Sequence, residues 1–140
     1  MRYGEFISSF LIDLQRLFRS DISIKDMTYS QVLAVISIPS DGIEMSELAI
    51  KLGLDNSTIT RLIVRLEKKG LVVREQSKKD KRAIKVLLKT KGSKLQQDIE
   101  NKIESLGEKI KMEIDEEKIE STLEHLYNFQ WGLKKTILKK

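Results

Sequence analysis

MSELAIKLGLDNSTITRLIVRLEKKGLVVREQSKKDKRAIKVLL, residues 45–88, predicts a short helix, a tight turn, a longer helix and a β-hairpin with a basic tip. Gly53 suits the left-handed conformation that ends a helix. Asp55 can cap the next helix by accepting a hydrogen bond from the main-chain amide of Ser57 or Thr58. Because the turn is short, it holds the two helices at a steep angle. This order of elements indicates a helix-turn-helix followed by a wing.

The longer helix has an apolar face and an opposite polar face. At about 100° per residue, its large apolar side chains fall together, and hydroxyls and cations lie on the other side. A solvated surface is one explanation of such a polar face. The other is a helix that enters the major groove of DNA with its N-terminus first, because short hydroxyls allow close approach and Arg61 is long enough to reach a guanine edge. The candidate DNA-binding residues on this helix are Asn56, Ser57, Thr58, Thr60, Arg61, Arg65 and Lys68.

A hairpin of β-branched strands is expected after Gly70, with residues 71–75 paired to residues 83–88. A narrow basic tip can enter a minor groove, where the potential of DNA is most negative. The alternative explanation of a basic tip is that its charges only protect a sheet edge from pairing with another chain. Because a recognition-type helix lies next to the hairpin, we favour DNA binding. The cations of the tip, residues 76–82, are Lys78, Lys79, Lys81 and Arg82.

The segments on both sides of this stretch are predicted to be helical. Thr28 and Gln31 form a capping box that opens a nearly all-apolar helix. An amphipathic helix precedes it at residues 3–18, and two more follow, for which Thr90 and Asp115 are candidate caps. The amphipathic helices carry more apolar surface than a small winged helix can cover, so we expect a dimer interface.

The expected fold class is therefore mainly α with a small β-hairpin wing, a winged helix-turn-helix with N- and C-terminal dimerisation helices. We expect a single domain over residues 1–140. Within it, residues 28–90 are expected to form the DNA-binding lobe, and residues 1–27 and 91–140 to dimerise.

Positive charge is concentrated in the same module. The chain has 26 Lys and Arg against 21 Asp and Glu, which gives a formal net charge of +5. Residues 44–91 carry a net charge of +7, whereas residues 1–43 and residues 92–140 each carry −1. A positive field confined to one module indicates a localised site for a polyanion.

The composition argues against several classes of function. The chain has no Cys, which removes disulfides, thiolate metal sites and thiol-based oxidation sensing, and its one His is His125. We therefore expect no metal and no cofactor. No phosphate-binding loop, dinucleotide fingerprint or catalytic triad is present, so we expect no enzyme activity. No apolar run approaches the roughly 18 residues of a membrane span, and we expect a cytoplasmic protein.

With these features, the sequence resembles the multiple-antibiotic-resistance regulator (MarR) family of bacterial winged-helix transcription factors. NSTITRLIVRLEKKGLVVRE, residues 56–75, looks like the recognition helix leading into the wing. Asp80-Lys81-Arg82, followed by Val86-Leu87-Leu88 and Thr90-Lys91-Gly92, looks like the family's D-x-R wing and the L-T-x-x-G motif after it. One departure is Leu88-Lys89-Thr90 where Leu-Thr is usual. The resemblance covers nearly the whole chain.

The resemblance implies a homodimer joined through the first helix and the last two, acting as a repressor that a small-molecule effector relieves. A two-fold dimer demands an inverted-repeat operator in double-stranded DNA. The resemblance also implies that Arg82 enters the minor groove and that Asp80 braces the wing by pairing with Arg65; an ordinary exposed ion pair is the alternative for that contact. No residue is assigned to the effector. The alternative function is a winged-helix module that binds protein or RNA without operator specificity.

Overall fold

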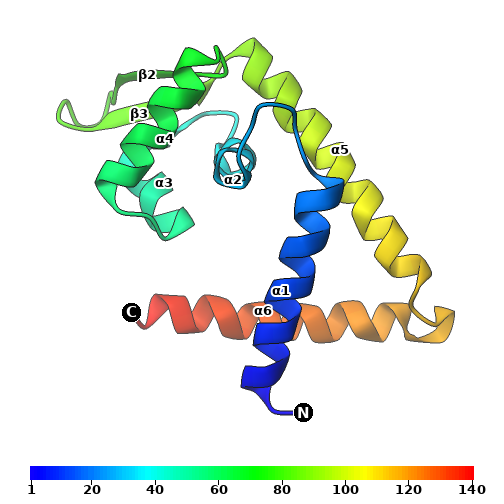
Figure 1. Ribbon diagram of the computed structural model, residues 1–140. Coiled ribbons are helices and arrows are strands. Elements are labelled where there is room, and N and C mark those ends of the chain that lie inside the picture. The colour runs from blue at the N-terminus through cyan, green and yellow to red at the C-terminus, as the bar shows by residue number, and fades with distance from the viewer. The chain divides into compact units, whose positions relative to one another are not determined.

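The computed structural model describes residues 1–140 and consists of six α-helices, a short 3-10 helix and a three-stranded antiparallel sheet (Figure 1). The chain forms two compact units, residues 1–103 and residues 104–140. The predicted fold class, mainly α with a small β wing, is confirmed. The elements are α1 (Tyr3–Asp21), α2 (Tyr29–Ser37), β1 (Ile43–Glu44), α3 (Met45–Leu52), α4 (Asn56–Lys68), β2 (Val72–Gln76), β3 (Ile84–Leu88), α5 (Thr90–Met112), η1 (Glu116–Lys118) and α6 (Ile119–Leu138).

The sheet has the strand order β1-β3-β2, and β2 and β3 form the hairpin that the sequence predicts. Their register pairs Val72 with Leu88 at one end and Gln76 with Ile84 at the other. The sequence did not predict β1, which pairs Ile43 with Val86 on the other side of β3. A strand of two residues is too short to show the period of two by which strands are found.

Local signals at the helix ends explain where α2 and α3 lie. The Thr28 hydroxyl accepts a hydrogen bond from the Gln31 amide at 3.2 Å, and the Gln31 side-chain oxygen accepts one from the Thr28 amide at 3.2 Å. This confirms the predicted capping box. Gly53 follows α3 with a φ of 67°, the left-handed conformation expected of it.

The apolar faces of α2, α3 and α4 pack with the sheet to form the core of residues 1–103. Burial removes these side chains from water and is the main favourable term in folding. The buried apolar residues of these elements, with Leu71 just before β2, are Val32, Ala34, Val35, Leu48, Ala49, Ile59, Leu62, Ile63, Leu66, Leu71, Val72 and Val86.

The first turns of α5 hold the winged helix together. The Gln96 side-chain amide donates to the carbonyl oxygens of Val35 at 2.9 Å and Ile38 at 2.8 Å, so it satisfies acceptors at the end of α2. Gly92 is buried, and an added Cβ would lie 2.0 Å from the Leu71 carbonyl oxygen. The start of α5 is thus fixed against both α2 and the segment that leads into β2.

The structure corrects two expected helix starts. Thr90 is the first helical residue of α5, and the preceding carbonyl, that of Lys89, accepts the first helical bond from Ser93 at 2.8 Å. Asp115 makes no side-chain cap bond; its carboxylate pairs with Lys118 at 3.2 Å across the 3-10 turn η1, and α6 begins at Ile119. The prediction for Asp115 was wrong because an α-helix and a 3-10 turn begin with the same residue types.

Two helices expose long apolar faces. Neither α1 nor α6 has a fully buried residue, although both have apolar side chains at helical spacing. None of the helices is both long and apolar enough to cross a membrane. The large apolar residues exposed on these two helices are Tyr3, Ile7, Phe10, Leu11, Ile12, Leu14, Leu17, Leu123, Leu126, Tyr127, Trp131, Leu133, Ile137 and Leu138.

Candidate nucleic-acid interface

Helix α4 begins at a well-formed cap. The Asp55 carboxylate accepts hydrogen bonds from the Thr58 amide at 2.7 Å and from the Ser57 hydroxyl at 2.8 Å. These bonds, the one from the Thr58 amide first, lower the pKa of Asp55 to about 2. The predicted cap is confirmed, and it orders the end of α4 that carries the short polar side chains.

Replacement of Asp55 by alanine is expected to destabilise the fold in a pH-dependent way. The folded-state pKa lies below the ordinary value of 3.8, so the stabilisation is present above about pH 4 and is lost as pH falls through about 2. Urea unfolding of both proteins between pH 7 and pH 2 should show a difference that shrinks over this acid range. Asp55→Asn, which keeps an acceptor, should have a smaller effect at pH 7. A difference that stays constant down to pH 2 would contradict this role.

The polar face of α4 is open to solvent. Asn56, Ser57, Thr60, Arg61, Arg65 and Lys68 are exposed, and Thr58 is half-buried. The Thr60 hydroxyl donates to the Asn56 carbonyl at 2.7 Å, as the Ser57 hydroxyl donates to Asp55, so both hydroxyls are oriented as acceptors toward the outside. The guanidinium groups of Arg61 and Arg65 make no hydrogen bond or ion pair within the chain, which leaves both groups free for a ligand.

The wing tip presents the four predicted cations. Lys78, Lys79, Lys81 and Arg82 are all exposed in the loop between β2 and β3, which projects from the winged helix in Figure 1. The loop is closed by hydrogen bonds from the Ser77 amide to the Ala83 carbonyl at 2.9 Å and from the Ala83 amide to the Asp80 carbonyl at 3.0 Å. The four cations therefore lie in a tight, hydrogen-bonded turn.

Asp80 acts inside this turn. Its carboxylate accepts a hydrogen bond from the Arg82 amide at 2.9 Å. The ion pair with Arg65 that the family resemblance implies is not formed; this is a correction to the expected contact. An Asp carboxylate that bonds an amide two residues later shapes a turn locally, so Asp80 orients the segment that carries Arg82.

Two other contacts attach the wing to the rest of the fold. The Glu67 carboxylate, in the last turn of α4, pairs with the Arg74 guanidinium of β2 at 3.1 Å. Hydrogen bonds from Arg74 lower the pKa of Glu67 below its ordinary value. The buried Ser77 hydroxyl donates to the Glu44 carboxylate of β1 at 3.2 Å. Neither contact was predicted from the sequence; the spacing of Glu67 and Arg74 around the Gly70 turn was the available signal for the first.

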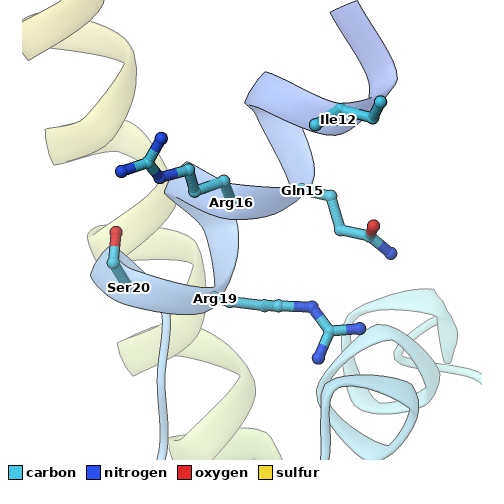
Figure 2. A pocket seen from close by; sticks show the side chains of 5 residues that line it. All are labelled: Ile12, Gln15, Arg16, Arg19 and Ser20. Carbon is cyan, nitrogen blue, oxygen red and sulfur yellow. The ribbon is translucent and has the colours of Figure 1, made fainter. Parts of the chain in front are cut away.

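Recesses in the surface of residues 1–103 include the following. One, of about 490 Å³, lies along α1 and is lined by Ile12, Gln15, Arg16, Arg19 and Ser20; Figure 2 shows Arg16 and Arg19 pointing in different directions. A second, of about 400 Å³, is mostly apolar, and Phe18, Ile22, Met27, Tyr29 and Val32 contribute to it. A third, of about 450 Å³, has four lysines on its rim, Lys25, Lys69, Lys91 and Lys94.

The apolar recess has one cation at its edge. The Arg19 guanidinium lies 4.8 Å from the centre of the Tyr29 ring, and Phe18 meets the same ring edge-on at 5.5 Å. No group of three or more His, Asp or Glu side chains is placed to hold a metal ion. The basic surface of α4 and the wing is thus the main candidate for a macromolecular ligand, and the apolar recess for a small molecule.

Comparison with known proteins places the chain in a family. The model of the MarR family matches residues 27–84. The HTH-type transcriptional regulator SarZ of Staphylococcus saprophyticus is 30% identical over 105 residues, which cover 74% of this chain and 72% of that protein. The HTH-type transcriptional regulator TtmR of Methylorubrum extorquens is 30% identical over 102 residues, which cover 72% of this chain and 52% of that protein.

Solved structures agree with these sequence relatives. A point mutant of MarR from E. coli superposes with a TM-score of 0.79 at 26% identity, over 94% of this chain and 97% of that chain. MepR of S. aureus in a DNA complex has the same fold, with a TM-score of 0.74 at 20% identity over 95% of this chain and 99% of that chain. With its helix-turn-helix, its wing and these relatives, the chain belongs to the MarR family of helix-turn-helix transcriptional regulators.

Proposed function

We propose that this protein is a homodimeric, sequence-specific regulator that binds double-stranded DNA, represses transcription and is released by a small-molecule effector. The observation that carries the proposal is the exposed cationic face of α4 beside a wing tip with four cations. Relatives named as transcriptional regulators support it, as do the DNA complexes of two proteins of the same fold, MepR of S. aureus and FabT of Streptococcus pneumoniae. Such relatives also argue against an enzyme.

Each part of the surface has a distinct proposed role. Helix α4 enters the major groove from its N-terminal end, where Arg61 reads a base edge and Lys68 contacts the phosphate backbone. The wing follows the backbone to the adjacent minor groove, which Arg82 enters. The short side chains near Asn56 allow the helix to approach closely.

Arg61→Ala is expected to cost about 1–3 kcal/mol of operator binding and to relax the preference at one base position in each half-site. Lys68→Ala, which removes a contact to the phosphate backbone of DNA, should weaken binding to all sequences alike. Both variants should be measured against a panel of single-base operator substitutions. The assignment fails if Arg61→Ala lowers every affinity by the same factor, or if Lys68→Ala changes the base preference.

The exposed apolar faces of α1, α5 and α6 are proposed to form the dimer interface. A helix of 20 residues such as α6 with no buried side chain leaves a large apolar surface in water, and a second copy of the chain covers it by two-fold symmetry. The division proposed on this basis assigns residues 1–27 and 91–140 to dimerisation and residues 28–90 to DNA binding. The two-fold axis requires an inverted-repeat operator with half-sites about 10–10.5 bp apart.

The protein is expected to sediment as a dimer at micromolar concentration. Leu126→Asp or Ile110→Asp should shift it toward monomer, because each places a charge in an apolar contact. Asn128→Asp, which adds the same charge to a polar position of α6, is the matched control and should remain a dimer. A wild-type monomer in sedimentation equilibrium at this concentration would refute the proposed assembly.

The apolar recess between α1 and α2 is the proposed effector site. Its volume of about 400 Å³ suits a small organic molecule, and Arg19 at its edge favours one with a negative charge. Phe18 and Tyr29 contribute aromatic surface to its lining. A ligand in this recess would contact α2. The carbonyls at the C-terminal end of α2 accept hydrogen bonds from Gln96 of α5, so a shift of α2 would be passed to the helix that follows the wing.

The experiment that tests the function is selection of bound fragments from the organism's own genome, repeated with small aromatic carboxylates. Enrichment of one inverted repeat near promoters, with release by a ligand, is the expected result. Recovery of random fragments alone would contradict operator specificity. Tighter binding to RNA or to a protein than to any selected DNA fragment would support the alternative, a winged-helix module that binds protein or RNA.

A further inference from the structure

The contact between α4 and the wing is a bidentate ion pair with an additional main-chain hydrogen bond. Glu67 Oε1 accepts a hydrogen bond from Arg74 Nη2 at 3.1 Å, and Glu67 Oε2 accepts one from Arg74 Nε at 3.3 Å. Glu67 Oε2 also accepts a bond from the main-chain amide of Arg74 at 3.3 Å. One carboxylate thus holds both the side chain and the backbone of a single strand residue. Two parallel bonds to a guanidinium fix direction as well as distance.

The position of these residues connects the two parts of the basic surface. Glu67 lies in the last turn of α4, the helix that carries Arg61 and Arg65. Arg74 lies in the middle of β2, an edge strand of the sheet, three residues before Ser77, where the loop that carries the wing cations begins. A bond to the backbone of β2 therefore fixes the path of the hairpin relative to the helix.

We propose that Glu67 and Arg74 are positioning residues that set the wing relative to α4, so that the major-groove and minor-groove contacts form together. Neither residue needs to touch DNA for this role. The inference rests on the proposed DNA-binding function and adds to it the contact that couples its two halves.

Electrostatics and positioning predict opposite results for one substitution. Glu67 is an anion on a surface proposed to bind a polyanion, so its neutralisation should strengthen binding if only charge mattered. If Glu67 positions the wing, neutralisation should weaken binding, because the wing cations no longer meet the groove together with α4. Glu75, the next residue after Arg74 in the same strand, is an exposed carboxylate that makes no side-chain hydrogen bond, and it provides the matched control.

The test compares wild type, Glu67→Gln, Arg74→Gln and Glu75→Gln on the selected operator at two salt concentrations. Major-groove contact is detected as protection of guanine N7 from dimethyl sulfate. Wing contact is detected as protection of the flanking minor groove from hydroxyl radicals. Glu67→Gln and Arg74→Gln should bind about tenfold more weakly, keep the major-groove protection and lose the flanking protection. Their salt-dependence slope should fall by up to about 0.9 for each lost wing contact. Glu75→Gln should bind as tightly as wild type or more tightly.

Rescue separates positioning from a general structural role. The charge swap Glu67→Arg with Arg74→Glu should regain part of the flanking protection that each single variant loses. If Glu67→Gln behaves like Glu75→Gln, the proposal is overturned. It is also overturned if the variants lose both kinds of protection together with a lowered melting temperature, since the pair then acts on folding alone. Failure of the proposed function is distinguishable, because wild type itself would then show no operator-specific protection.

Discussion

Arg82→Ala is expected to weaken operator binding roughly ten- to hundredfold, far more than Lys78→Ala or Lys79→Ala, although each variant removes one positive charge. Arg82 follows the turn that Asp80 closes, and it is the guanidinium of the wing tip. A narrow minor groove concentrates negative potential, and an inserted arginine gains from it more than a lysine on the backbone does. In each lysine variant, the slope of the logarithm of the binding constant against the logarithm of salt concentration should become shallower by up to about 0.9.

The same series should include Asp80→Ala and operators with different flanks. Asp80→Ala raises the net charge but removes the hydrogen bond to the Arg82 amide, so we expect weaker binding. Operators with A·T-rich flanks should be preferred by wild type and less so by Arg82→Ala. If Asp80→Ala binds more tightly and the three cation variants lose affinity alike, the wing is only a charged loop.

Gly92→Ala is expected to destabilise the fold by about 3 kcal/mol or more, at the upper end of what overpacking costs. An added Cβ would lie 2.0 Å from the carbonyl oxygen of Leu71 and 3.0 Å from its carbonyl carbon. That oxygen already accepts a hydrogen bond from the Lys89 amide at 2.9 Å, so neither backbone can yield easily. The start of α5 must therefore move away from the segment that enters β2.

Gly107→Ala is the matched control for this prediction. Gly107 lies in the same helix, and an added Cβ there would have nothing within 4 Å beyond the adjoining helix backbone, so the substitution should raise helix stability by up to about 1 kcal/mol. The free energy of unfolding of both variants can be measured by urea denaturation. Equal stability of Gly92→Ala and wild type would show that α5 does not pack on Leu71 as described.

Much of the fold could be predicted because its signals are local. The Thr28 capping box, the Asp55 cap and the left-handed Gly53 each involve residues within three or four positions of one another, and all three are confirmed. The apolar periodicity of α4 predicted one buried face, and Ile59, Leu62, Ile63 and Leu66 on this helix are all buried. A short-range pattern of this kind places an element with its buried face and does not depend on its neighbours.

Contacts between elements could not be predicted in the same way. The strand β1 has only two residues, and the Ser77–Glu44 bond joins residues 33 positions apart. The pairing of Asp80 with Arg65, taken from family resemblance, is replaced by a local bond to the Arg82 amide, while Glu67 joins α4 to the wing. Several carboxylates were available to hold the wing, and only the packing of β2 on α4 determines which of them does.

The most direct test of a specific DNA-binding regulator is the ratio of two dissociation constants, for the selected inverted repeat and for a scrambled duplex of equal length and composition. Both should be measured on the full chain at physiological salt, since the nonspecific term depends steeply on salt. We expect the inverted repeat to bind at least ~10³-fold more tightly. A ratio close to one would contradict operator specificity, because the basic surface would then be a general polyanion site.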